Sequence, residues 1–294
     1  MTDCFNITSI GERHVIEKTV CQDSSVSMSK DGISIAAVAD GHGGPHYSRS
    51  DIGAKLAVGV AVKCITAFVD EMDKSIFSGK PLVKYGVARE LDEEQKSSEL
   101  YKQIHSLLAS VLYYWELEVQ DHVEKNPFTS DELHAFSSEY QDMLKTGYSQ
   151  DVPYGTTLLA CIQTDCFWLA FQIGDGKVLI SDKGAWHNPI PDDDNCYDNI
   201  TTSMCDKHAI DDFRFCFQSD GHFPDAVFLC TDGMEHSFAS IDKLTDYYKN
   251  ILDVVKDGSK ELLLKHLKKI LPTFSMMTTG DDISVTCIYN NINE

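Results

Sequence analysis

Basic residues are scarce in this sequence. Its 294 residues contain 25 lysines and arginines against 46 aspartates and glutamates, which leaves a net charge of -21. Such a balance repels phosphate backbones and anionic lipid headgroups, so a nucleic-acid or membrane partner is disfavoured. An acidic chain can also concentrate divalent cations, but a well-solvated surface explains the same balance and is the favoured interpretation.

Other features are missing as well. None of the ten cysteines forms a Cys-x-x-Cys pair, which disfavours a structural zinc site. Residues 1–10 lack the basic start and apolar run of a secretory signal, and we expect no apolar stretch long enough to span a bilayer. Cysteines inside apolar runs, such as Cys64 and Cys161, fit a reducing interior. We therefore expect a cytoplasmic protein.

The first half of the chain predicts one strand followed by helices. Residues 33–39 are apolar and partly β-branched, and they run into Asp40-Gly41, which is typical of a buried strand that ends in a tight turn. Apolar residues recur at helical spacing from Ile52 onward and again over 100–115. Residues 69–150 could form a helical layer or a helical insert, and we favour the layer because no Pro/Gly/Ser linker bounds them.

The second half predicts mostly strands. Residues 157–163 and 166–173 are apolar and joined by Thr164-Asp165, which indicates a hairpin. Further strands are expected at 177–181, 213–217, 226–231 and 283–289, and helices at 244–252 and 262–271. The polar residues 182–212 predict a surface segment. Hairpin-joined strands favour antiparallel sheets, so we expect an α+β sandwich of two sheets covered by helices, formed as a single domain by residues 1–294.

Four aspartates lie at or beside the ends of predicted strands, and a fifth follows Cys21-Gln22. A single Asp-Gly after a strand is usually only a turn, so the argument depends on the combination. Carboxylates that converge repel one another unless cations neutralise them, and hard oxygen ligands suit Mg²⁺ or Mn²⁺. The five are Asp23, Asp40, Asp175, Asp232 and Asp281.

Two such cations would explain a phosphoryl-transfer chemistry. Paired metals lower the pKa of a water molecule and offset the charge of a phosphoryl group during in-line attack. The leaving oxygen then needs a proton, and His42, two residues from Asp40, titrates in a range suited to a general acid. Taken alone, His42 would be an ordinary surface histidine.

The ordered motifs resemble the type 2C, metal-dependent protein phosphatases, in a form similar to bacterial members. The set comprises Cys21-Gln22-Asp23-Ser24, Ala39-Asp40-Gly41-His42-Gly43-Gly44, Tyr154-Gly155-Thr156-Thr157, Ile173-Gly174-Asp175-Gly176, Cys230-Thr231-Asp232-Gly233 and Gly280-Asp281-Asp282-Ile283-Ser284. The motifs extend over essentially the whole chain. The resemblance implies an α-β-β-α sandwich and hydrolysis of phosphoserine or phosphothreonine on proteins with two Mn²⁺ or Mg²⁺ ions and a possible third.

The resemblance also implies residue roles. Asp40 would bridge two metals, and the carbonyl of Gly41 would bind one of them. Asp232 and Asp281 would hold the other, and Asp175 would hold a third, weaker one. By the same resemblance, Asp23 would sit in or just outside the metal shell and His42 would donate the proton.

This sequence departs from the family pattern beside the first motif. Gln22 stands where many relatives have Glu, which removes a charge near one metal. Lys18 stands near the place of a phosphate-binding Arg; we favour Lys18 for that role, with Arg13 as the alternative, although lysine offers a point charge and not a fork. We choose Asp281 over Asp282 because relatives usually carry Asn at the second position. Residues 182–212, with Asn199 to Thr202, lie where the family has a variable flap that could select substrates.

Alternatives to an active protein phosphatase remain open. A catalytically weak or inactive module of the same fold could bind a signalling partner, and Gln22 and Lys18 support that interpretation. A phosphomonoesterase with non-protein substrates would carry the same motifs. The favoured interpretation also implies a partner serine/threonine kinase, and we expect a monomer.

Overall fold

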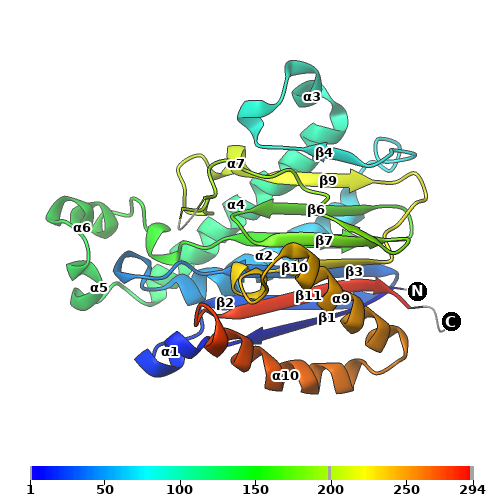
Figure 1. Cartoon of the computed structure of the whole chain (residues 1–294). Helices are drawn as coiled ribbons and strands as arrows, with labels where there is room; N and C mark the ends of the chain where they lie inside the picture. The colour runs from blue at the N-terminus through cyan, green and yellow to red at the C-terminus, as the bar shows by residue number, and fades with distance from the viewer. Residues whose placement is uncertain (1, 198–199, 292–294) are drawn as a thin grey trace.

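Two antiparallel sheets stack face to face in the computed structural model, which describes residues 2–197 and 200–291. One sheet has five strands in the order β1-β11-β10-β7-β8, and the other has six in the order β2-β3-β5-β6-β9-β4. Helices cover the outer face of each sheet (Figure 1). This arrangement confirms the predicted α+β sandwich of four layers, α-β-β-α.

The elements follow one another along the whole described chain. The strands are β1 (Thr2–Ser9), β2 (Asp23–Lys30), β3 (Ile33–Asp40), β4 (Val83–Tyr85), β5 (Leu158–Gln163), β6 (Trp168–Ile173), β7 (Lys177–Asp182), β8 (Ala185–His187), β9 (Arg214–Gln218), β10 (Ala226–Cys230) and β11 (Ile283–Asn290). The α-helices are α1 (Glu12–Glu17), α2 (Ser50–Glu71), α3 (Glu93–Ser97), α4 (Glu99–Lys125), α5 (Ser130–His134), α6 (Ser138–Lys145), α7 (Ala209–Asp212), α8 (Asp232–Glu235), α9 (Ile241–Lys256) and α10 (Lys260–Met277). Short 3-10 turns are η1 (Pro45–Tyr47), η2 (Ala88–Glu90) and η3 (Val152–Tyr154).

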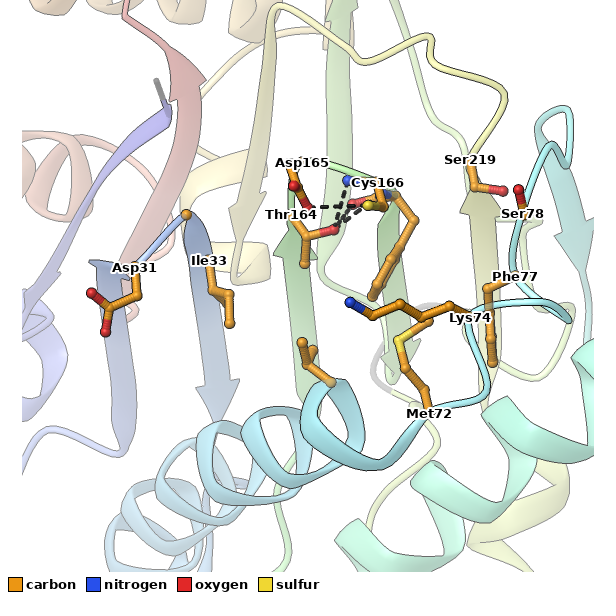
Figure 2. A pocket seen from close by; sticks show the side chains of 13 residues that line it. Asp31, Ile33, Met72, Lys74, Phe77, Ser78, Thr164, Asp165, Cys166 and Ser219 are labelled. Atoms are coloured by element: carbon orange, nitrogen blue, oxygen red, sulfur yellow. Dashed lines mark hydrogen bonds between the residues drawn. The ribbon is translucent and has the colours of Figure 1, made fainter.

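The predicted hairpin of β5 and β6 is confirmed. The two strands pair antiparallel from Leu158–Ile173 to Gln163–Trp168, and the amide of Thr164 donates to the carbonyl of Phe167 at 2.9 Å. Figure 2 shows this turn beside Asp31 of the β2–β3 turn, around a cavity of about 360 Å³. None of the predicted site residues lines that cavity.

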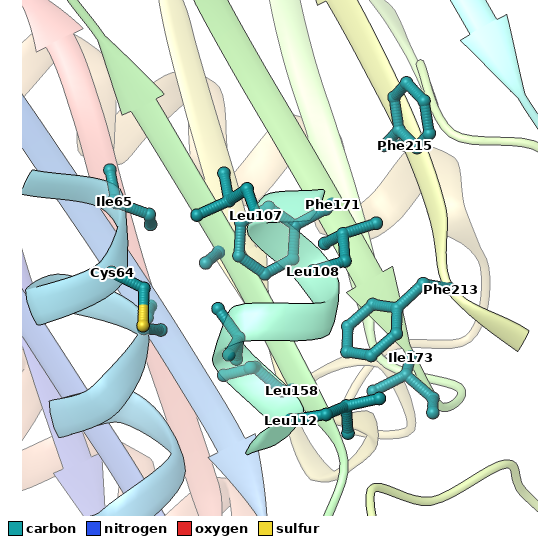
Figure 3. Packing of buried hydrophobic residues seen from close by; sticks show 14 of the residues in the cluster. Cys64, Ile65, Leu107, Leu108, Leu112, Leu158, Phe171, Ile173, Phe213 and Phe215 are labelled. Carbon is teal, nitrogen blue, oxygen red and sulfur yellow. The ribbon is translucent and has the colours of Figure 1, made fainter. Parts of the chain in front are cut away.

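Three apolar layers hold the sandwich together. The largest lies between the six-stranded sheet and helices α2 and α4; Figure 3 shows Leu108 of α4 beside Phe171 of β6, with Ile65 of α2 in the same layer. A second layer joins the five-stranded sheet to α9 and α10, and a third fills the space between the sheets. The predicted helical faces therefore point into the core.

Helix α2 corrects one expectation from the sequence. By length and composition it is long and apolar enough to cross a membrane, although we expected no such stretch. In the structure α2 contacts β2, β3, β5 and α4, and residues such as Ala57, Ala61 and Ile65 are completely buried. Core helices of this kind pass the same test of length and composition.

Two predictions about the second half were incomplete. The strand expected at 177–181 forms as β7, but the sequence did not predict its partner: it crosses to the other sheet and pairs with β10. The segment 182–212 is not only a surface loop, because it contains β8 and α7 and buries Ile190 and Met204. Residues 198–199 of this segment lie outside the described part of the chain.

Helices α4, α5 and α6 occupy the region 69–150 together with α3. Helix α4 packs on α2 and the sheet, whereas α5 and α6 extend to the side in Figure 1. The prediction of a single domain over 1–294, with a helical layer or insert, stays a prediction.

Candidate functional site

A cavity of about 610 Å³ opens at the end of the sandwich where β3 reaches Asp40. Six of the predicted site residues line it: Asp40, Gly41, His42, Asp175, Asp232 and Asp281. They come from four regions of the sequence that strand pairing brings together. Antiparallel pairing of β10 with β11, for example, places the end of β10 beside the start of β11, close to Asp232 and Asp281.

The backbone of Asp40 is fastened by the Gly-Thr-Thr motif. Its amide donates to the hydroxyl of Thr157 at 3.0 Å, and its carbonyl accepts from the amide of Thr157 and from the hydroxyl of Thr156, both at 2.9 Å. Threonine is well suited to binding both the amide and the carbonyl of Asp40 because its hydroxyl can both donate and accept. The motif therefore fixes the strand end that carries the central carboxylate.

Asp23 lies behind Asp40 and outside the lining of the cavity. It pairs with Asp40 across β2 and β3 and is only 4% exposed. Its Oδ2 accepts from the hydroxyl of Thr231 at 2.8 Å, while Oδ1 has no hydrogen-bond partner in the described residues. Burial, and next the charge of Asp282, raises the pKa of Asp23 well above its usual range.

The carboxylates at the cavity disturb one another in the same way. Burial, followed by the charges of Asp23 and Asp232, raises the pKa of Asp40 well above its usual range. The pKa of Asp175 is raised by burial and then by Asp232. Crowded, desolvated carboxylates of this kind are stabilised by a nearby cation.

The donor set fits a hard divalent cation. The ligand candidates are carboxylate oxygens, and the buried Oδ1 of Asp232 has no hydrogen-bond partner in the described chain. In the described residues no three His, Cys, Asp or Glu side chains already form a closed group that could hold an ion. The fit is thus one of chemistry, namely oxygen donors with unused lone pairs around one cavity.

His42 is held at the wall of the cavity by Gly155. The amide of His42 donates to the carbonyl of Gly155 at 3.0 Å, and its ring meets the edge of Tyr47 with centroids 5.0 Å apart. Burial lowers the pKa of His42 to about 4, while the charge of Asp175 acts in the opposite direction. An anionic substrate would raise the pKa of the ring again.

Asp281 and Asp282 occupy different environments. Asp281 lines the cavity, whereas Asp282 is 3% exposed. The Asp282 carboxylate accepts from the amides of Gly11 and Gln22, both at 2.6 Å, and from Nδ1 of His14 at 2.9 Å. Asp282 therefore ties the start of α1 and the first motif to β11, and its oxygens are already used.

The two candidate phosphate-binding cations also differ. Lys18 ends α1 in the left-handed conformation with φ 58°, is exposed, and is absent from the cavity lining. Arg13 lines the cavity, and its Nη2 lies 3.1 Å from Oδ1 of Asp281. The side chain of Gln22 lies in the same lining. The arrangement favours Arg13, which was the alternative in the sequence prediction, over Lys18.

Sequence reasoning missed several lining residues. His236 lines the cavity with its Nδ1 3.6 Å from Oδ2 of Asp232, and the spacing of four residues in a helical turn was the available signal. The segment 182–212 contributes Thr201, Ser203 and Asp206, so it borders the site as a flap would. Asn199 of the predicted Asn-x-Thr-Thr lies outside the described residues.

The comparisons with known proteins identify the family and the fold. A family model described as protein phosphatase 2C matches residues 10–272. A search of curated proteins found no significant match.

Solved structures of similar fold cover nearly the whole chain. PppA, a regulatory component of T6SS in Pseudomonas aeruginosa, is 15% identical with a TM-score of 0.56, over 98% of this chain and 97% of that one. The catalytic domain of the serine/threonine protein phosphatase PstP, in complex with two manganese ions, is 13% identical with a TM-score of 0.53 and the same coverage. Stp1 from Staphylococcus aureus is 12% identical with a TM-score of 0.52, over 99% and 95% of the two chains. At these identities the likeness concerns the fold.

Proposed function

The chain belongs to the protein phosphatase 2C family, and we propose that it hydrolyses phosphoserine and phosphothreonine on proteins with the help of bound Mn²⁺ or Mg²⁺. One observation carries this proposal: Asp40, Asp232 and Asp281, which lie far apart in the sequence, line a single cavity. Burial, followed by the charges of Asp23 and Asp232, raises the pKa of Asp40, and a divalent cation would reverse that shift.

Asp40, Gly41, Asp232 and Asp281 are the proposed holders of two ions, and Asp175 of a possible third. When bound, such ions would supply an activated water and offset the charge of the phosphoryl group. Asp23 is buried and pairs with Asp40 across β2 and β3, and its Oδ1 has no hydrogen-bond partner among the described residues; it would act from just outside this set. His236 is added to the residues proposed around the ions because its ring lies beside Asp232.

The remaining polar groups would bind the substrate and move the proton. Arg13 presents a guanidinium at the cavity, and its planar fork suits two phosphate oxygens. His42 is the proposed proton donor to the leaving serine or threonine oxygen. The charge of the bound phosphate would favour the protonated imidazole that this role needs.

Phosphatase activity of the purified protein tests the proposal. We expect hydrolysis of a phosphothreonine peptide with Mn²⁺ and none after chelation. Asp40→Asn should lower the rate by at least about 10²-fold, because a carboxylate central to the site is lost. Absence of metal-dependent hydrolysis from phosphopeptides and aryl phosphates alike would overturn the proposal.

A second candidate is a weak or inactive phosphatase fold that binds a signalling partner. Two observations favour it: Gln22 places a neutral amide in the cavity lining, and the described carboxylates do not form a closed ligand group. Calorimetry separates the two, since a pure binding module would show no Mn²⁺ uptake at the cavity. A phosphomonoesterase for small substrates would instead keep the metal-dependent rate on aryl phosphates and lose it on phosphopeptides.

Partners and location complete the proposal. A phosphorylated protein is the proposed substrate, paired with a serine/threonine kinase, and the protein acts as a monomer without nucleic-acid or membrane partners. A cytoplasmic location is proposed with it, supported by the ten cysteines, all of which are free thiols.

A further inference from the structure

The loop between β3 and α2 carries the proposed proton donor and is held at both ends. We call residues 41–49 the catalytic loop. At its start the amide of His42 donates to the carbonyl of Gly155 at 3.0 Å, and at its end the amide of Arg49 donates to the carbonyl of Pro153 at 2.9 Å. One short segment, residues 153–157, therefore binds both ends of the loop.

The side chain of Arg49 links the catalytic loop to the end of α4 and to α5. Arg49 is 6% exposed, and its guanidinium uses all five N–H donors. Nε and Nη2 donate to the two carboxylate oxygens of Glu132 at 2.6 and 3.0 Å. The other three bonds go to the carbonyl oxygens of Asn126 and Pro127 and to the hydroxyl of Tyr154, at 2.7, 3.1 and 2.9 Å. The guanidinium also lies 4.3 Å from the ring centroid of Phe128.

Both carboxylate oxygens of Glu132 also accept hydrogen bonds in this cluster. It closes the capping box of α5, because Oε2 accepts from the amide and the hydroxyl of Thr129 at 2.7 and 2.9 Å. The bond to Arg49 is the main reason why the pKa of Glu132 falls to about 2. Planar fork geometry makes arginine the side chain that satisfies five acceptors at once, and lysine cannot replace it.

Tyr154 connects the same cluster to His42. Its hydroxyl accepts from Arg49 and lies 2.6 Å from Nδ1 of His122, to which it can donate. The residue is completely buried, and it directly precedes Gly155, whose carbonyl holds the amide of His42. The end of α4 and the start of α5 thus hold Arg49 and Tyr154, which lie at the two attachment points of the catalytic loop.

We propose that Arg49 and Glu132 are positioning residues, which clamp the catalytic loop to residues 153–157 and so set the place of His42 and Asp40 at the cavity. In this view the end of α4 and the start of α5 support the catalytic loop without touching the substrate. The test of this inference by kcat rests on the proposed function, while the test by amide hydrogen exchange does not.

A loosened clamp should affect turnover and not substrate affinity. Displacing a reacting group by about 1 Å costs on the order of 10²-fold in rate. Arg13, the proposed phosphate contact, lies on α1. Its side chain contacts Asp281 and its amide donates to the carbonyl of Gly280, and neither partner belongs to the Arg49 cluster. We therefore expect kcat to fall about 10- to 100-fold while KM changes by less than about 3-fold.

Three variants test the clamp. Glu132→Gln keeps the shape and removes the charge, and Arg49→Lys keeps the charge and removes the fork. Glu118→Gln is the matched control, because it removes the charge from the 2.9 Å pair of Lys63 with Glu118, which joins α2 to α4 outside the Arg49 cluster. Each variant is assayed for kcat and KM with Mn²⁺, and amide hydrogen exchange is followed over residues 41–49.

Faster exchange over 41–49 together with a lower kcat in Glu132→Gln and Arg49→Lys, and neither change in Glu118→Gln, would support the clamp. A lower melting temperature with unchanged exchange in the loop, or faster exchange with an unchanged kcat, would overturn it. If the wild-type protein proves inactive with every metal, the proposed function fails, and hydrogen exchange alone still decides whether the clamp holds the loop.

Discussion

Replacing Gly155 by alanine should displace His42 without unfolding the chain. The backbone of Gly155 has φ −48° and ψ 132°, which alanine adopts without strain. A Cβ at this position would lie 2.8 Å from Cδ2 of His42 and 2.8 Å from Cδ1 of Tyr47, whereas ordinary contacts begin at 3.4 Å. Both rings must therefore retreat from the added methyl group.

The size of the effect follows from that distance. Opening each contact from 2.8 Å to 3.4 Å moves the His42 ring by a little over half an ångström. Overpacking of this kind costs about 1–3 kcal/mol in unfolding free energy. For a chain of this length that corresponds to a fall in Tm of roughly 2–10 °C. A displacement of this order in a catalytic group should lower kcat about 10- to 100-fold.

The assay compares Gly155→Ala with a second glycine variant. In Gly59→Ala the new Cβ meets nothing within 4 Å, and the residue lies inside α2. This control should keep the wild-type rate and gain about 0.5–1 kcal/mol from the better helix former. A Gly155→Ala enzyme with kcat within about 2-fold of wild type would refute the reasoning, because a displaced proton donor must slow the reaction.

Three further outcomes are expected. In the metal-free protein Asp40→Asn should raise the free energy of unfolding by ~1 kcal/mol in a denaturant titration, because it removes a buried charge among like charges; a destabilised variant would contradict that account of the site. Arg13→Ala should raise KM for an aryl phosphate about 10-fold, and Lys18→Ala should leave it unchanged, since only Arg13 lines the cavity; the reverse result would restore Lys18 to the role. The Arg49–Glu132 pair should lose its stabilising effect as pH falls from 4.5 towards about 2, because the pKa of Glu132 is lowered in the folded state. That difference in pKa corresponds to ~3 kcal/mol, which partial exposure reduces to ~1–2 kcal/mol, and acid titration of Glu132→Gln should lack it.

Local patterns were enough to predict the parts of the fold whose signals are short-range. Strand β3 and the β5–β6 hairpin followed from apolar runs and turn residues. The capping box of Thr129 and Glu132 at the start of α5 is a local feature of the same kind. These features depend on neighbouring residues in the sequence, so a single chain displays them.

Long-range pairing was beyond the same reasoning. Strand β2 is rich in serine and half-exposed, and it becomes a strand through its pairing with β3. Nothing in β7 itself says which of two sheets it joins. Arg49 shows the limit at the site most clearly, because its main partner is Glu132, 83 residues further along the chain. The motifs could predict four of the aspartates that line the cavity, while the contacts that hold the catalytic loop depend on the fold.

The location of bound manganese tests the account most directly. Crystals of the protein soaked with Mn²⁺ and measured at the manganese absorption edge would show each ion by its anomalous signal. The account predicts two ions about 3.5–4 Å apart in the cavity, held by Asp40, Asp232 and Asp281. A cavity that stays without anomalous signal at millimolar Mn²⁺, in crystals that diffract well, would contradict it.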